Sequence, residues 1–141
     1  MKKEKVPTLR YGQGNFHVFK EALSAECILK YGDAGKLIKL GTHFEEKRPE
    51  VNDFDAEADL DLQRALYIDA MKNWRRNQNA LVAKRSMMFT FIWTHLSAES
   101  QEEVRSNTDY KTFSVSLDPE KLWQVVEATH GVHSVSKVTK V

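Results

Sequence analysis

Cysteine, glycine and proline are all scarce in this chain of 141 residues. Cys27 stands alone, which excludes an intramolecular disulfide framework and a zinc site built from several cysteines. Six glycines and three prolines interrupt regular structure at few places, so the composition favours helices. A single cysteine also fits a reducing compartment, and we therefore expect a cytoplasmic protein.

Long apolar runs and a strong net charge are also missing. No stretch approaches the roughly 20 apolar residues that a membrane span requires. The opening segment MKKEKVPTLR is basic but has no apolar run behind it, so we expect neither a signal peptide nor an anchor. The net charge of +1 gives no global drive toward nucleic acid. We expect no membrane partner.

Apolar residues recur at steps of three and four along most of the chain, which predicts amphipathic helices. The length is that of one domain. The fold class that we predict is all-α, a compact bundle of five to seven helices. We divide the chain into a flexible basic segment (1–14), a helical domain (15–131) and a C-terminal tail (132–141).

The predicted helices are bounded by recognisable start and stop signals. Asn15, Asp33, Ser97 and Asp118 are candidate N-caps, and Pro119 suits the first position of the helix that ends before Gly131. The predicted elements are helices over 15–32 and 33–41, a linking loop over 42–55, a long helix from Ala56 toward Leu96, a helix over 98–106, a loop over 107–117 and a helix over 118–131.

Two points of this assignment stay open. The long helix either runs unbroken or breaks near residues 77–80, where two asparagines lower the helix propensity. Met87 to Trp93 are apolar around most of the helix circumference, so we expect this stretch to be the central core helix, on which Trp123 packs. The predicted core consists of Phe16, Phe19, Leu23, Phe89, Ile92, Trp93, Leu122, Trp123 and Val126.

Residues that could carry chemistry do not assemble into a recognised motif. His130 and His133 are three apart, but Gly131 lies between them and no carboxylate or thiol cluster is adjacent. Cys27 falls on the apolar stripe of its helix, which indicates a structural thiol rather than a nucleophile. The sequence therefore predicts no catalysed reaction, no cofactor, no metal and no small-molecule substrate.

Basic residues from 71 to 85 are the one charged feature that suggests a binding surface. No acidic residue interrupts this stretch, and Trp74 lies beside two of the arginines. A basic strip with an aromatic neighbour is suited to phosphates, although a solvated or protein-facing surface is the more ordinary interpretation. The candidate contacts to RNA or to a protein partner are Arg75, Arg76, Lys84 and Arg85.

Two longer segments carry a family resemblance. NFHVFKEALSAECILKYGDAGKLIKLG (15–41) resembles the opening helices of the Gag protein of copia-like LTR retrotransposons, where an aromatic-rich helix ends in Tyr-Gly. RSMMFTFIWTHLSAESQEEVRSNTDYKTFSVSLDPEKLWQVVEATHG (85–131) is similar to the later part of the same domain, with its Leu-Ser, Asp-Pro, Leu-Trp and Thr-His order. Together they cover 74 of the 141 residues.

The resemblance implies a capsid amino-terminal lobe, a structural segment that self-assembles into a virus-like particle around the element's RNA. It implies a homo-oligomer, with contacts made by early helices around residues 17–39. The chain departs from a full Gag because it has no second lobe and no CxxC zinc knuckle. The alternatives that remain are a helical nucleic-acid-binding or protein-interaction module without shell assembly and, less favoured, a small helical enzyme.

Overall fold

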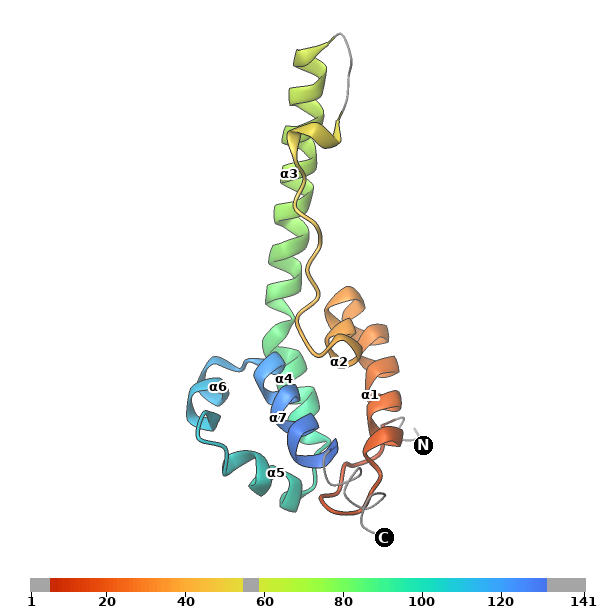
Figure 1. Cartoon of the computed structure of the whole chain (residues 1–141), viewed down its shortest axis with the longest axis vertical. Coiled ribbons are helices and arrows are strands. Elements are labelled where there is room, and N and C mark those ends of the chain that lie inside the picture. The colour runs from red at the N-terminus through yellow and green to blue at the C-terminus, as the bar shows by residue number, and fades with distance from the viewer. Residues whose placement is uncertain (1–5, 55–58, 132–141) are drawn as a thin grey trace. The chain divides into compact units, whose positions relative to one another are not determined.

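Helices dominate the computed structural model, which describes residues 6–54 and 59–131 (Figure 1). Within these residues no strand forms, and the only β-pairing is an isolated bridge between Leu9 and Leu96. The predicted all-α class with five to seven helices is confirmed. The α-helices are α1 (Phe16–Tyr31), α2 (Leu37–Leu40), α3 (Leu60–Ala83), α4 (Arg85–Thr94), α5 (Ala98–Arg105), α6 (Tyr110–Ser116) and α7 (Pro119–Val126).

The described residues form two compact units, and the predicted helical domain over 15–131 includes residues of both. Unit 1 comprises residues 6–44 and 84–131 and contains every α-helix except α3. Two 3-10 segments, Gly32–Lys36 in unit 1 and Val51–Asp53 in unit 2, and a π-helical turn over Glu127–Gly131 complete the elements. Unit 2 comprises residues 45–83, and the predicted tail, 132–141, lies outside the described residues.

The interior of unit 1 is lined by α1, α4 and α7. α1 buries Phe16, Phe19, Leu23 and Cys27 on one face, as its three- and four-residue spacing predicts. Gly35 packs directly on this helix, since a Cβ at Gly35 would lie 2.3 Å from the backbone carbonyl carbon and oxygen of Cys27. Only glycine therefore allows the chain to turn back so close to α1.

Trp123 of α7 lies at the centre of this interior with no exposed surface. Its ring stacks on Phe16, with 5.7 Å between ring centroids, and tilts against Phe19 at 6.3 Å. Its Nε1 donates a hydrogen bond to the carbonyl of Ile38 at 3.0 Å. The aromatic contacts of Trp123 are thus made with α1, and α7 also packs on α4, the helix on which the sequence predicted Trp123 to pack.

The predicted core residues are buried except for Trp93, which is half-buried. Trp93 stacks on Phe89, with 6.4 Å between centroids, and its ring is covered by Arg105 with its Cζ 5.2 Å away. Met87 of the same helix is 53% exposed. α4 is therefore enclosed on one side only, through Met88, Phe89 and Ile92, and is not surrounded as its composition suggested.

The segment before α1 packs on unit 1, although its composition predicted a flexible arm over 1–14. Val6 and Leu9 are buried. The amide of Leu9 donates to the carbonyl of His95, and the amide of Ser97 donates to the carbonyl of Leu9, both at 2.8 Å. Two apolar side chains in a short polar stretch gave no periodic signal, but they anchor residues 6–9.

Two of the predicted caps hold their helices. Ser97 accepts a hydrogen bond from the amide of Ser100 at 3.2 Å, and Asp118 accepts from Glu120 and Lys121 at 3.0 and 3.4 Å. Asn15 occupies the N-cap position of α1 without capping it, because its Oδ1 accepts from the amide of Arg10 at 3.5 Å instead, while its Nδ2 donates to the carbonyl of Thr8 at 3.1 Å. The prediction was wrong for this cap. Asp33 lies inside the 3-10 turn and pairs with Lys36.

α6 forms where the sequence predicted a loop over 107–117. It buries Phe113 alone, so its pattern was too short to recognise. Leu117 ends the helix in the left-handed conformation, with φ of 53°. Glycine is the usual residue at this position, because a branched side chain is strained there. Since Leu117 occupies it, the sequence carries no glycine stop signal.

α3 begins at Leu60 and continues through residues 77–80 to Ala83, so the helix is interrupted at Lys84 rather than at the asparagines. Asp59 caps its start by accepting from the amide of Leu62 at 3.0 Å. Residues 45–54 run along one face of α3, where Trp74 Nε1 donates to the carbonyl of Glu46 at 2.9 Å. Met71 is the one buried residue of this helix.

Candidate interaction surfaces

Cys27 lies at the buried centre of α1 and is unsuited to nucleophilic chemistry. Its side chain is fully buried in unit 1. Burial, with a smaller contribution from Glu26, raises the pKa of the thiol to about 12. Since the thiolate is the reactive form, the thiol stays protonated and inert at neutral pH. This agrees with the structural role that its place on the apolar stripe predicted.

His130 joins three separate parts of unit 1 through hydrogen bonds. Its Nε2 lies 2.8 Å from the hydroxyl of buried Ser100, and that hydroxyl donates to the carbonyl of Leu9 at 3.1 Å. The Nδ1 lies 2.7 Å from the hydroxyl of Thr129. Both ring nitrogens therefore have polar partners from the fold itself. His133, the second member of the sequence pair, lies outside the described residues.

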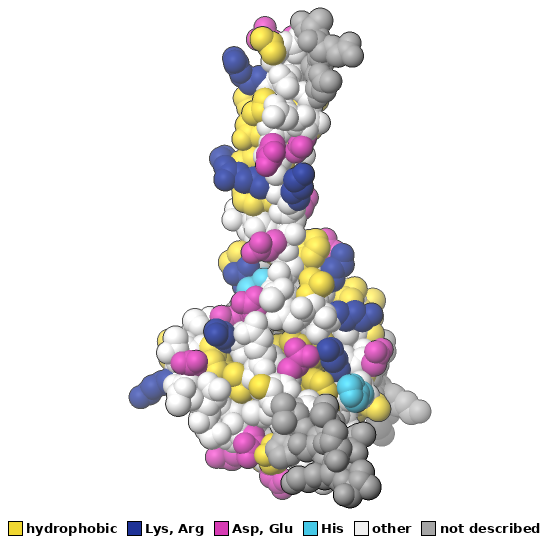
Figure 2. Space-filling view, in the orientation of Figure 1, with side chains coloured by type: hydrophobic (Ala, Val, Ile, Leu, Met, Phe, Trp, Pro, Cys, Tyr) yellow, Lys and Arg dark blue, Asp and Glu magenta, His cyan; other side chains and the backbone are white. Residues whose placement is uncertain are grey.

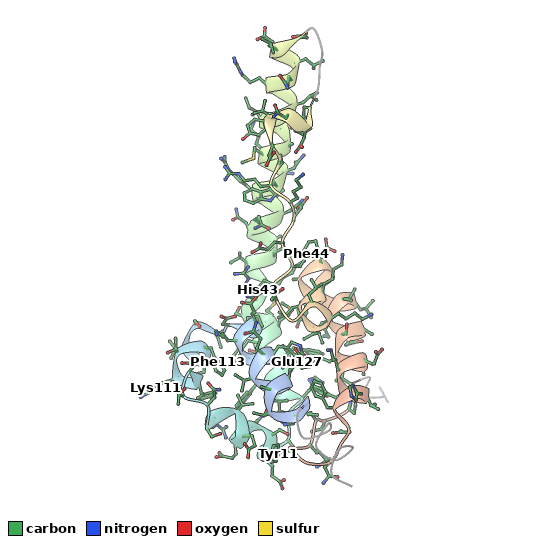
Figure 3. The ribbon with its side chains drawn as sticks, in the orientation of Figure 1. Tyr11, His43, Phe44, Lys111, Phe113 and Glu127 are labelled. Atoms are coloured by element: carbon green, nitrogen blue, oxygen red, sulfur yellow. The ribbon has the colours of Figure 1, made fainter. Side chains whose placement is uncertain are left out.

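His43, Asp118 and Glu120 form a cluster that the sequence did not suggest (Figure 3 labels His43). One ligand atom from each lies within 4.8 Å of the others. The amide of His43 donates to Glu120 at 2.8 Å, and its Nε2 lies 3.4 Å from Asp118. His43 and Glu120 are 77 residues apart in the chain, so spacing alone did not reveal the cluster.

The hydrogen bonds of this cluster join two segments of unit 1 that are distant in the chain. The same Asp118 oxygen that faces His43 also accepts the two amides that start α7. The positive end of α7 favours anions over cations at this position. These contacts hold residues 42–44 against the first turn of α7, which fixes the end of the α1–α2 region.

The four basic candidates are divided between the two units. Arg75 and Arg76 are exposed on α3 in unit 2. Lys84 and Arg85 are half-buried in unit 1, where Lys84 Nζ donates to the carbonyl of Tyr31 at 3.5 Å. Lys72, which the sequence analysis did not single out, shares a face of α3 with Arg75 and Arg76. Figure 2 shows basic and hydrophobic side chains interleaved along this unit.

The outer face of α1, opposite the buried face, is apolar as well. We define the α1 outer face as Val18, Ala22, Ala25 and Leu29, which follow one another at steps of four, three and four. Val18 is 66% exposed and Leu29 is 71% exposed. Hydrophobic side chains reach the surface over α1 and α2 in the space-filling view (Figure 2).

A helix that is apolar on two opposite faces is normally covered on both. In unit 1 the interior covers the face that carries Phe16, Phe19, Leu23 and Cys27. On the α1 outer face Val18, Ala25 and Leu29 are exposed, whereas Ala22 is partly buried and packs against the interior of unit 1. This exposed apolar stripe is the candidate interaction surface of unit 1.

No protein-family model, curated protein sequence or solved structure matches this chain. None of the described helices combines the length and the apolar character needed to cross a membrane.

Proposed function

We propose that this chain is a structural, Gag-capsid-like protein that self-associates into a shell around retroelement RNA. The observation that carries the proposal is the α1 outer face. It lies within residues 17–39, where the resemblance to copia-like Gag implies contacts between copies. An apolar stripe that is largely exposed in the described part of the chain suits a protein that works by association.

The order of side chains on the α1 outer face is self-complementary. In an antiparallel pair of α1 helices related by a two-fold axis, Val18 of one copy faces Leu29 of the other. Ala22 then faces Ala25, because each pair is centred on the midpoint between Leu23 and Ser24. Small residues at the centre let helix axes approach to about 8 Å, which favours close packing.

Substitutions in this face test the proposal. Val18→Glu and Leu29→Glu place a charge in the paired stripe at positions that are already exposed, so the fold of unit 1 is retained. We expect each variant to form smaller assemblies than the wild-type chain in sedimentation velocity experiments. The matched control is Val115→Glu on α6, which is 82% exposed and lies off the face, and which leaves assembly unchanged. Assembly at the wild-type level in both α1 variants would contradict the proposal.

A second function, a helical nucleic-acid-binding module without shell assembly, is favoured by Lys72, Arg75 and Arg76. These side chains are exposed on one face of α3, where they reach phosphates without leaving the helix. Arg75→Glu tests this function with fluorescently labelled single-stranded RNA. Loss of RNA binding by a protein that never self-associates supports the module. RNA held in particles and protected from nuclease supports the shell.

A further inference from the structure

Unit 2 has too little interior to account for its own folding. Met71 is the one buried residue on the 24 residues of α3. Residues 45–54 cover the face that carries Trp74 and Met71, through hydrogen bonds such as the one from Gln63 Nε2 to the carbonyl of Val51 at 3.2 Å. Single helices are marginal in water without packing partners. The remaining surface of α3 is therefore where a partner would stabilise this unit.

The face of α3 opposite residues 45–54 has a coiled-coil spacing. We define the α3 outer face as the exposed residues that alternate at steps of three and four over about 32 Å of helix. They are Leu62, Ala65, Asp69, Lys72, Arg76, Asn79 and Ala83. Apolar or small residues occupy both ends, and charged residues occupy the middle.

The charges on this face are complementary to those of a second copy. When two α3 helices run antiparallel about a two-fold axis between Lys72 and Asn73, Asp69 of each faces Arg76 of the other. The same register brings Leu62 opposite Ala83. Large apolar side chains at one end of the helix thus meet small ones at the other end, and two opposite-charge pairs flank the axis.

We infer that the α3 outer face binds a second copy of this chain as an antiparallel helix pair. The inference rests on the proposed function, since it assigns a second interface to a self-associating protein. Two-fold pairing through α1 alone would stop at a dimer. A second two-fold interface on α3 links dimers to one another, so that assemblies grow beyond two copies, as a shell requires.

Lys72 is the residue that we expect to weaken this interface. It lies beside the two-fold axis, so the two Lys72 side chains approach each other in the pair. Like charges at this distance oppose association, although long lysine side chains reduce the cost by extending into solvent. The expected result is that Lys72→Ala strengthens the α3 pair. A weaker pair after this change would contradict the register.

The experiment isolates the α3 pair by removing the α1 pair. Full-length Val18→Glu serves as the background, and sedimentation velocity measures its dimerisation. In this background Asp69→Arg or Arg76→Asp alone turns two attractive pairs into two repulsive ones, which we expect to raise the dimer dissociation constant about tenfold or more. Mixing the two variants restores dimers, because one chain then carries two arginines at these positions and faces a chain that carries two aspartates. The double variant Asp69→Arg/Arg76→Asp restores them too.

The outcomes separate the two proposals. If the inference is wrong, the Val18→Glu background is monomeric, or mixing the charge variants restores nothing. If only the α1 interface is wrong, the chain forms the same dimer with and without Val18→Glu. The charge reversals at Asp69 and Arg76 still weaken that dimer. If the α3 outer face instead packs on unit 1 of the same chain, or binds RNA through Arg76, the Val18→Glu protein is a monomer. The charge reversals then leave its mass in sedimentation unchanged. Either result overturns the α3 pair.

Discussion

Trp123 in unit 1 is fully buried, whereas Trp74 in unit 2 is half-exposed, with Arg48 over its ring at 5.7 Å. Both indoles donate to a backbone carbonyl at 2.9 to 3.0 Å. They differ in what surrounds the ring. Trp123 is enclosed by α1 and α7, while Trp74 rests against a single extended segment.

This difference teaches that helical pattern alone does not decide which helices hold a fold together. α1 and α3 both carry regular apolar stripes, but the buried face of α1 joins a core shared with other helices of unit 1, whereas α3 buries only Met71. Unit 1 therefore has a larger interior than unit 2. In the account proposed above, second copies cover the exposed faces of α1 and α3.

The largest expected effect comes from truncating the two tryptophans. Trp123→Ala removes the stack on Phe16 and the hydrogen bond to Ile38, which we expect to lower the free energy of unfolding by about 3–5 kcal/mol. Trp74→Ala, its matched control in unit 2, should cost less than about 1 kcal/mol in the main transition. Urea denaturation followed by circular dichroism measures both. Equal costs would remove the distinction between the units.

Each unit has a helix that an aspartate caps, and removing these caps compares the two units with a smaller expected effect. Asp118→Ala removes the cap of α7 and should destabilise unit 1 by about 1 kcal/mol. Asp59→Ala removes the cap of α3, and we expect little change in the main transition but faster amide exchange in the first turns of α3. Hydrogen exchange by mass spectrometry reports both. Faster exchange confined to unit 1 in both variants would be inconsistent with two units.

Thiol reactivity gives the smallest and most local test. Because burial raises the pKa of Cys27 to about 12, raising the pH from 7 to 9 should leave the native protein almost unlabelled by iodoacetamide. An exposed thiol, with a pKa near 8.5, would react much faster over that range. In urea, labelling should follow global unfolding of unit 1. Rapid labelling of the native state at pH 9 would show that the α1 interior opens easily.

Periodicity predicted the parts of the fold that are set by regular burial. The stripes of α1 and α7, the Ser97 and Asp118 caps and the buried thiol all follow from local spacing, and the structure has them. The basic candidates were chosen as one run of sequence. The helix is interrupted at Lys84, where unit 1 resumes, so Lys84 and Arg85 belong to the other unit, and no residue type in that run signals the interruption.

Other features depend on contacts between residues that are distant in the chain, so no local sequence pattern predicted them. The burial of Leu9 requires the carbonyl of His95 and the amide of Ser97, which lie more than 80 residues away. α6 buries Phe113 and packs Tyr110 against the core, too few apolar positions for a helical pattern, so its sequence resembles that of a loop. The α1 outer face consists of alanines and aliphatic residues that the sequence analysis did not single out, and the structure shows that Val18 and Leu29 are exposed.

Disulfide cross-linking across the α1 outer face tests the central claim most directly. One chain carries Ala22→Cys and a second, isotopically labelled chain carries Ala25→Cys, while Cys27 stays buried and unreactive. Antiparallel pairing predicts that mild oxidation of the mixture yields mainly mixed dimers, identified by mass spectrometry. A yield dominated by dimers of like chains, or no cross-link where the wild-type chain associates, would contradict the account.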